Sequence, residues 1–259
     1  MNLRFTVVTV TYNAGEVLRK TIQSVVEQKY LPYEYIIIDG ASTDKTLDIV
    51  EEYRVKFESL GIKLTVVSEK DNGVYFAMNK GIHYATGDFI SFLNAGDWYE
   101  TDALKQVNDC YRENEFDLFY GGIHYYNTDG SVVNKMSKDD KNGIVTSRHW
   151  NHPSMFLRSE LYKDAPFNEE FRIYSDFELY LRMRKKNIEI FVYDGIISNF
   201  VAGGISTNPN FKFVCMRAKE KYKAYRVNKY SRFYWFESYG WEFLKCLYFA
   251  CKKGRKKKN

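Results

Sequence analysis

The stretch FTVVTVT, residues 5–11, is a run of β-branched and aromatic residues that is short enough to be a single buried strand. Residues 16–28 follow it with apolar side chains on one helical face, and YIII at 35–38 is a second apolar run. Buried strands separated by an amphipathic helix are typical of a parallel sheet covered by helices on both faces. The opening segment therefore predicts an α/β fold.

The same alternation continues through the first half of the chain. Residues 63–67 and 88–93 read as further strands, and residues 75–85 between them read as a helix. A helix capped by Ser42 or Thr43 is expected to reach about Phe57. The pattern predicts a Rossmann-like, mostly parallel sheet flanked by helices.

The second half is less regular. Residues 116–126 and 131–136 flank an NTDG turn and predict a hairpin, followed by a polar loop at 138–142 that we interpret as a flap. Residues 176–186 read as a helix, and the pattern from residue 210 onward is helical and basic.

Composition excludes several classes of protein. Of the 259 residues, 45% are hydrophobic and 27% charged, an ordinary globular mixture that rules out disorder and collagen. The net charge of +5 hides an asymmetry, because residues 210–259 carry 15 Lys+Arg and three Glu whereas the rest of the chain is net −7. Any contact with a polyanion is therefore expected at the tail, and the acidic body argues against nucleic acid.

The cysteines and the hydropathy bear on location. The four cysteines form no CxxC pair, and FTVVTVT begins without a secretory leader before it, so we expect a cytoplasmic protein. No run of about 18 uncharged apolar residues is present, which argues against a membrane-spanning helix.

Polar residues follow three of the predicted strands. The first strand runs into TYN at 11–13, the second into DGASTD at 39–44, and the fourth into NAGD at 94–97. Ligands of open α/β sheets bind beyond the carboxyl ends of the strands, so these residues are expected on one rim. Taken singly, each segment is equally well explained as a cap or turn.

Together, these residue types match one kind of ligand. Asp39 can accept a hydrogen bond from the ring N–H of a base, and Tyr12 can stack on that base. Asp97 can coordinate Mg²⁺, which takes one or two protein carboxylates and fills its other positions with phosphate and water. The rim therefore suggests a nucleoside diphosphate held partly through a metal.

Four ordered segments carry a family resemblance: FTVVTVTYNAG, YIIIDGASTDKT, DNGVYFAMNKGIHYATGD and FISFLNAGD. Over residues 4–205 or so, the chain resembles the inverting nucleotide-sugar glycosyltransferases of family 2, which have the GT-A fold. It is most similar to the bacterial branch that builds capsule and exopolysaccharide. The resemblance implies a donor site made of Thr11, Tyr12 and Asn13 at the nucleoside, Asp39 at the base, Asn79 and Lys80 near the sugar and diphosphate, and Asp97 at a divalent metal, Mg²⁺ or Mn²⁺.

The chain departs from the family pattern at two positions. Asn94 stands where the family has the first carboxylate of its Asp-x-Asp-type metal motif, which leaves Asp97 as the one firm metal carboxylate. Phe76 stands where relatives often have Asp, so any donor contact made by that acid is absent.

The resemblance also implies an acceptor side. Asp176 matches the carboxylate that takes the proton from the acceptor hydroxyl, with Glu178 in reserve, and His152 matches a histidine near the acceptor. The plainer alternatives are that Asp176 is a helix N-cap and that His152 is structural. One in-line displacement without a covalent intermediate would invert the anomeric centre.

The domain prediction places a GT-A domain at 1–209, with a nucleotide-binding half at 1–120 and an acceptor-binding half at 121–209. Residues 210–259 form a helical extension in which FYWFESYGWEFLKCLYFAC, at 233–251, precedes KKGRKKK. Aromatic and basic residues favour the surface of an anionic membrane, so we expect peripheral attachment to the inner face of the cell membrane and a lipid-linked or glycan acceptor. The alternative is a helix packed on the body with a solvated basic end.

Other functions fit less well. A hydride-transfer enzyme needs a G-x-G-x-x-G turn after the first strand, and TYNAG lacks it. A sugar-phosphate nucleotidyltransferase would begin with a Gly-rich loop bearing Arg and Lys, which is also missing. The strongest rival is a non-catalytic, membrane-tethered protein that binds nucleotide sugars or glycans, and Asn94 is the one feature that favours it.

Overall fold

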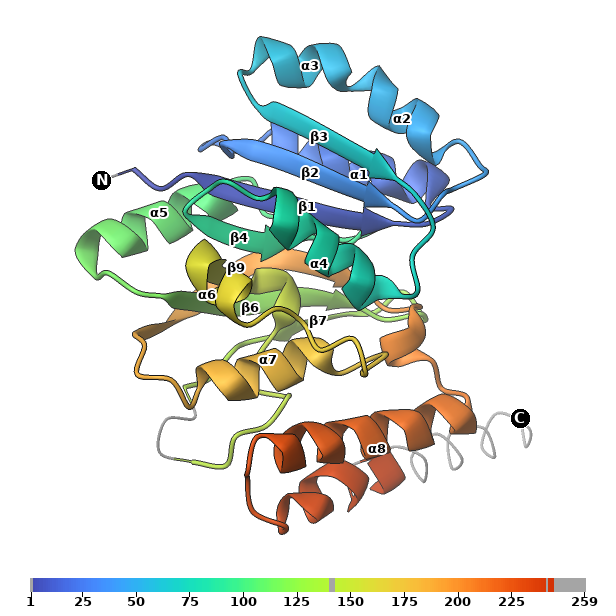
Figure 1. Ribbon diagram of the computed structural model, residues 1–259, viewed down its shortest axis with the longest axis vertical. Coiled ribbons are helices and arrows are strands. Elements are labelled where there is room, and N and C mark those ends of the chain that lie inside the picture. The colour runs from blue at the N-terminus through green and yellow to red at the C-terminus, as the bar shows by residue number, and fades with distance from the viewer. Residues whose placement is uncertain (1, 140–142, 241, 245–259) are drawn as a thin grey trace. The chain divides into compact units, whose positions relative to one another are not determined.

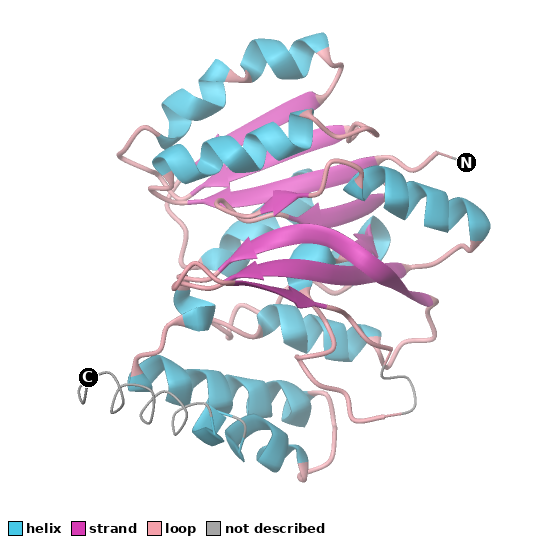
Figure 2. Cartoon of the chain, turned by 180° about the vertical axis from the view of Figure 1, so that it is seen from behind, coloured by secondary structure: helices cyan, strands magenta, loops and turns pink. Residues whose placement is uncertain are grey.

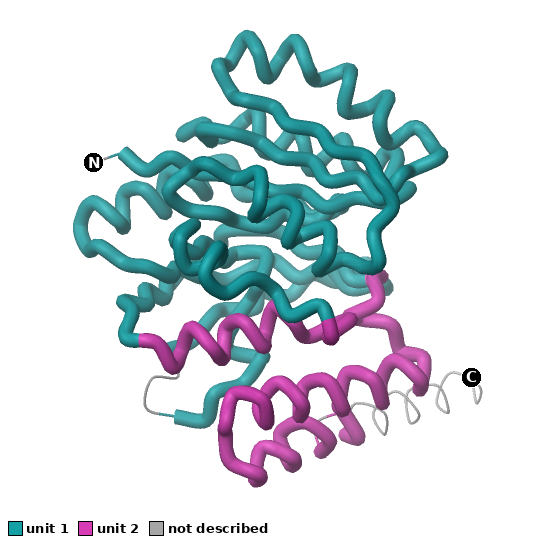
Figure 3. Tube along the Cα trace, viewed as in Figure 1, with its two compact units in different colours: residues 1–169, 187–202 teal, residues 170–186, 203–259 magenta. Residues whose placement is uncertain are grey.

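The computed structural model in Figure 1 describes residues 2–139, 143–240 and 242–244. The chain divides into two compact units, one of Met1–Glu169 with Asn187–Ala202 and the other of Glu170–Lys186 with Gly203–Asn259 (Figure 3). This division differs from the predicted boundary at 209/210, because the segment 170–186 groups with the C-terminal helices. The assignment of functions to these parts stays a prediction.

The first unit contains a single sheet, which Figure 2 shows from behind. Within the described residues it has nine strands in the order β3-β2-β1-β4-β8-β6-β9-β5, and β7 pairs with β6. The neighbouring strands β3 and β2, β2 and β1, and β1 and β4 pair in parallel. β8 is antiparallel to both of its neighbours, β4 and β6. The strands are β1 Phe5–Thr11, β2 Glu34–Asp39, β3 Lys63–Ser68, β4 Phe89–Phe92, β5 Trp98–Tyr99, β6 Leu118–Tyr126, β7 Val132–Lys135, β8 Phe156–Arg158 and β9 Ile190–Val201.

Helices cover both faces of this sheet (Figure 1). They are α1 Gly15–Val26, α2 Thr46–Glu52, α3 Arg54–Ser59, α4 Val74–Tyr84, α5 Ala103–Glu113 and α6 Ser159–Asp164. Phe5 and Val7 of β1 belong to the same core cluster as Leu18 of α1. On the other face, a Cβ added at Gly81 of α4 would lie 2.4 Å from Cγ1 of Val8, so glycine is what lets α4 pack closely against β1. The predicted α/β fold is confirmed.

Two local predictions need correction or completion. The helix expected from 42 or 43 to 57 is two short helices, α2 and α3, that meet at Tyr53. Asp44 rather than Ser42 or Thr43 bonds the start of α2, since its Oδ1 accepts from the backbone N–H of Thr46. The predicted hairpin is present as β6 and β7, whereas residues 140–142 of the expected flap lie outside the described residues.

The second unit is helical. It contains α7 Ser175–Met183, the short 3₁₀ turn η2 Ile205–Thr207, α8 Phe211–Val227 and the π-helical turn η3 Phe236–Gly240. The side chain of Asn210 caps α8 by accepting from the N–H of Lys212. Residues 245–259, which contain most of the predicted basic end, lie outside the described residues.

Candidate active site

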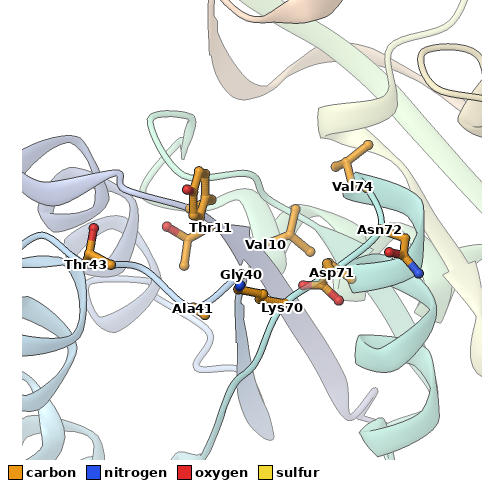
Figure 4. Close-up of a pocket in the computed structure, with 12 residues that line it drawn as sticks. Val10, Thr11, Gly40, Ala41, Thr43, Lys70, Asp71, Asn72 and Val74 are labelled. Atoms are coloured by element: carbon orange, nitrogen blue, oxygen red, sulfur yellow. The ribbon is translucent and has the colours of Figure 1, made fainter.

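A pocket of about 640 Å³ opens at the carboxyl ends of β1 and β2 in the first unit. β1 lies between β2 and β4, so the strand order reverses there, and ligands of open α/β sheets bind at such a reversal. Figure 4 shows side chains from the ends of β1 and β2 and from the loop before α4 around this space. The lining residues are Val10, Thr11, Tyr12, Gly40, Ala41, Thr43, Lys70, Asp71, Asn72, Gly73, Val74 and Ala77.

The end of β1 supplies a ring and a hydroxyl to the pocket. Tyr12 is 65% exposed, and a Cβ added at Gly40 would lie 3.3 Å from its ring, so the missing side chain leaves space for the ring. Oγ1 of Thr11 is buried without a hydrogen-bond partner among the described residues. A planar ring beside a hydroxyl that has no other hydrogen-bond partner among the described residues can bind a nucleoside. The binding roles of Thr11 and Tyr12 stay predictions.

Asp39 is fully buried where β2 ends, next to the pocket wall formed by Gly40 and Ala41. Its carboxylate accepts from the N–H and hydroxyl of Ser42 and, at 2.6 Å, from the hydroxyl of Ser68. A carboxylate has about four acceptor positions, so one further donor such as a base N–H can still be accommodated. Its role as the base ligand stays a prediction.

Asn13 links two loops at this edge of the sheet. Its N–H donates to Oγ of Ser42, and its Oδ1 accepts from the N–H of Thr43 at 2.9 Å. These bonds join the loops that follow β1 and β2. The geometry of Asn13 favours a role in shaping the nucleoside pocket, and direct contact with the nucleoside stays a prediction.

The loop at residues 70–73 is part of the site that the sequence interpretation did not assign. Lys70 and Asp71 line the pocket, and Lys80 of α4 forms ion pairs with Asp71 at 2.5 Å and with Glu69 at 2.7 Å. Hydrogen bonding to Asp71 and Glu69 raises the pKa of Lys80. The signal was available, because EKDNG follows β3 as directly as DGASTD follows β2.

Asn79 makes structural contacts within the first unit. Its Nδ2 donates to the carbonyl of Phe167 at 3.0 Å and to Oε1 of Glu169 at 2.8 Å, while its Oδ1 accepts from the N–H of Phe167 at 2.9 Å. The amide therefore ties α4 to the segment at 167–169, and Asn79 does not line the pocket. Its predicted contact with the donor sugar stays untested.

The turn at 94–97 contains the predicted metal position. Asp97 is 4% exposed and its Oδ1 accepts from the N–H of Val201 at 3.0 Å. Burial raises the pKa of Asp97 to about 7, because no described cation compensates its charge. Oδ1 of Asn94 is likewise buried and lacks a hydrogen-bond partner in the described part of the chain.

These two oxygen groups fit a hard divalent cation that brings phosphate and water as its other ligands. The described residues contain no cluster of three or more His, Cys, Asp or Glu side chains that could hold a metal by themselves. A cation at this turn would therefore depend on a bound diphosphate for most of its coordination.

His152 lies in an aromatic core of the first unit. Its ring centroid is 6.0 Å from that of Phe92, 5.9 Å from Phe167 and 5.7 Å from Trp150. Burial lowers the pKa of His152 to about 4, so the ring is neutral at physiological pH. This environment favours the structural alternative, and contact with the acceptor stays a prediction.

The candidate base belongs to the second unit. Asp176 is the second residue of α7, and its Oδ1 accepts from the N–H of Phe177, so it is not the N-cap that the plainer interpretation expected. Glu178 is 3% exposed and pairs with Arg182 at 2.9 Å, while Asn228 donates to it at 3.0 Å. These contacts favour a structural role for Glu178, and Asp176 remains the candidate base.

An α/β fold with its pocket at the strand reversal is typical of nucleotide-binding proteins, and the family comparison identifies the class. The family model described as "Glycosyl transferase family 2" matches residues 6–195. The chain belongs to glycosyltransferase family 2, and the predicted family and enzyme class are confirmed.

Relatives carry related descriptions. A "PGL/p-HBAD biosynthesis glycosyltransferase" of Mycobacterium tuberculosis is 32% identical over 69% of this chain and 68% of its own length. A Methanococcus voltae protein is 28% identical over 73% of this chain and 64% of its own length. It is named dolichyl N-acetyl-alpha-D-glucosaminyl phosphate 3-beta-D-2,3-diacetamido-2,3-dideoxy-beta-D-glucuronosyltransferase.

Solved structures share the fold. S. aureus TarS in complex with UDP-GlcNAc matches with a TM-score of 0.66 and 23% identity, over 87% of this chain and 65% of that one. The mannosyltransferase PcManGT of Pyrobaculum calidifontis, in complex with GDP-Man and Mn²⁺, matches with a TM-score of 0.60 and 16% identity. This match covers 85% of this chain and 61% of PcManGT. This chain thus spans less than two thirds of these structures, and the likeness shows the fold alone.

Proposed function

We propose that this protein transfers a sugar from a nucleoside-diphosphate sugar, with uridine as the base, to a hydroxyl of a lipid-linked or polysaccharide acceptor, with inversion, in cell-surface polysaccharide synthesis. The observation that carries the proposal is the pocket at the strand reversal, which is lined by the exposed ring of Tyr12, by Thr11 and by a polar loop. TarS, which shares the fold, is described in complex with UDP-GlcNAc, which supports uridine.

Different residues in and next to the pocket bind the base and the diphosphate of the donor. Tyr12 stacks on the base, and Asp39 accepts its ring N–H through the remaining acceptor position. Lys70 offers positive charge to the diphosphate, while Asp71 and Glu69 hold Lys80 on the second turn of α4. Positive charge near the leaving diphosphate lowers the barrier most if it is in place before reaction.

Asp97 and Asn94 would hold the divalent metal, Mg²⁺ or Mn²⁺. The bound ion supplies positive charge that stabilises the departing nucleoside diphosphate. The raised pKa of Asp97 supports this assignment, since a cation would relieve the cost of burying that carboxylate. PcManGT, described with Mn²⁺, has the same fold.

Asp176 takes the proton from the acceptor hydroxyl as that oxygen attacks the anomeric carbon. A single displacement by the acceptor, with the diphosphate leaving from the opposite side, inverts the configuration. Asp176 is half-buried on the first turn of α7.

A lipid-linked acceptor would place the protein at the inner face of the cell membrane. The name of the Methanococcus relative describes a dolichyl phosphate acceptor, and the basic tail supports the same location here. Across the described residues, no helix has the length and apolar character needed to cross a bilayer.

The test measures release of nucleoside diphosphate from UDP-, GDP- and dTDP-sugars, with and without Mg²⁺ or Mn²⁺. We expect a uridine donor to give metal-dependent release, and both Asp97→Asn and Asp176→Asn to reduce it by at least a hundredfold. Asp176→Asn should leave donor binding intact, whereas Asp97→Asn should weaken it only when metal is present. Donor binding without release, over a broad set of acceptors, would contradict the proposal and favour the non-catalytic binding protein.

A further inference from the structure

In the second unit, the helical residues at 234–240 and 242–244 turn their charged side chains inward. Glu237 is paired with Lys221 of α8 at 2.6 Å, and these side chains are 9% and 2% exposed. Glu242 is paired with Arg217 of α8 at 3.3 Å, with exposed fractions of 4% and 9%. The hydroxyl of Tyr225 also donates to Glu237. The acidic residues that interrupt this aromatic sequence are therefore neutralised against α8.

The opposite side of the segment is apolar and exposed. Phe236 and Phe243 are 67% and 64% exposed, and Phe233, in the turn just before the helical residues, is 79% exposed. Leu244 is 55% exposed and Trp235 46% exposed beside them. We call these five residues the aromatic face.

This arrangement reverses the usual amphipathic pattern of a surface helix in water. Such a helix normally buries its apolar stripe and exposes its charges, and paired charges are costly to bury. Here the two carboxylates of the segment are at most 9% exposed, while five large apolar side chains are 46–79% exposed. Several large exposed apolar side chains in one short segment suggest a site of interaction with an apolar phase or partner.

The sign of the charge near the aromatic face indicates what kind of partner it binds. Residues 210–259 contain three acidic residues, and two of them are the buried Glu237 and Glu242. The third, Glu220, accepts from the backbone N–H groups of residues 172–174. The exposed Lys229 and Arg232 precede the face, and the run KKGRKKK follows it in sequence. Exposed basic side chains beside exposed aromatic rings, in a segment whose sequence is strongly positive, match an anionic bilayer, where rings lie at the interface and basic groups meet phosphates.

We infer that the aromatic face docks on an anionic lipid surface, with Phe233, Phe236, Phe243 and Leu244 inserted among the lipids and Arg232 and Lys229 at the headgroups. A second copy of the chain would bring two surfaces of the same sign together, which disfavours dimerisation through this face. The inference concerns residues that do not line the donor pocket, so it does not depend on which sugar or base the enzyme uses.

Cosedimentation of the full chain with lipid vesicles tests this inference. We expect binding to vesicles of phosphatidylglycerol and phosphatidylcholine in equal parts, and much weaker binding to phosphatidylcholine alone. The triple variant Phe233→Gln, Phe236→Gln, Phe243→Gln should bind at least tenfold more weakly, because it removes the inserted rings. A matched control is Val55→Gln with Ile144→Gln, which replaces two apolar side chains of the first unit that are 75% and 67% exposed and should leave binding unchanged.

A second variant, Lys229→Glu with Arg232→Glu, should weaken binding to the anionic vesicles and reduce its salt dependence. The inference is overturned if the native chain ignores anionic vesicles, or if the triple variant binds them as the native chain does. It is also overturned if the native chain forms a dimer in solution that the triple variant abolishes while neither binds vesicles. Release of nucleoside diphosphate with a water-soluble acceptor should be the same for native and triple variant, which separates this test from that of the proposed function.

Discussion

Replacing Asn79 by alanine separates two roles for this residue, because the family resemblance places it at the donor sugar and the structure ties it to residues 167–169. The carbonyl and N–H of Phe167, a residue only 2% exposed, both bond the Asn79 amide. In Asn79→Ala these backbone groups lose their partners, and each buried unsatisfied group costs on the order of 1–3 kcal/mol. We therefore expect the free energy of unfolding to fall by about 3 kcal/mol.

Urea unfolding, followed by circular dichroism, measures that change, and titration with UDP measures donor affinity. If the amide is structural, affinity for UDP should change by less than about threefold at temperatures where the variant remains folded. Asn72→Ala is the matched control, since Asn72 is an exposed pocket residue. It should lose less than about 0.5 kcal/mol of stability and bind UDP more weakly.

The opposite pattern would refute this reasoning. If Asn79→Ala unfolds like the native protein but loses UDP or UDP-sugar binding, the bonds to Phe167 and Glu169 do not hold the segment, and the donor role is correct. Asn79→Asp adds a second check, because it keeps the acceptor for the Phe167 N–H but places a carboxylate near Glu169. Its loss of stability should be greater at pH 8 than at pH 4.

Three further predictions concern the core of the first unit. Gly81→Ala should lower stability by about 1–3 kcal/mol in urea unfolding, because its Cβ would overlap Val8, and adding Val8→Ala should recover part of that loss. The pKa of His152 is about 4 in the folded chain and about 6.5 in the unfolded chain, so between these pH values only the unfolded chain binds a proton there. The free energy of unfolding should therefore rise by about 3 kcal/mol from pH 4 to pH 6.5. Unfolding of His152→Phe should depend less on pH over this range, and an unchanged slope would contradict the burial argument. Burial disfavours the charged form of Glu34, but hydrogen bonds outweigh this effect and lower the pKa of Glu34 below 4.5. The charged carboxylate therefore stabilises the fold above pH 4.5, and this contribution is lost as the pH falls further. Glu34→Gln should be less stable than the native protein in urea unfolding at pH 7, and the difference should shrink in acid.

Much of the fold could be predicted because its signals are local. FTVVTVT and YIII consist of β-branched and aromatic residues, as is common in strands covered on both faces, and the structure has them as the buried strands β1 and β2. The division of the expected helix at 42–57 into α2 and α3 was not predictable in this way. The start of α2 at Thr46 follows a bond to Asp44, and the break comes at Tyr53; helical periodicity reveals neither.

The candidate site was partly predictable for the same reason. Strand ends locate Thr11 and Tyr12, which line the pocket, and the same argument applied to β3 would have included Lys70 and Asp71. What each polar side chain contacts was less accessible. Asn79 bonds Phe167 and Glu169, which lie 88 and 90 positions further along the chain. The sequence motif around Asn79 does not indicate these partners.

The sequence by itself determined the family, the parallel half of the sheet and the accumulation of positive charge after residue 210, because each follows from residue types in a local order. Only the tertiary structure decided which side of the aromatic segment faces outward. Glu237 and Glu242 look like interruptions in an apolar helix until Lys221 and Arg217 of α8 lie against them. The energy of a charge depends on its neighbours in space, and those neighbours are set by the packing of helices rather than by position along the chain.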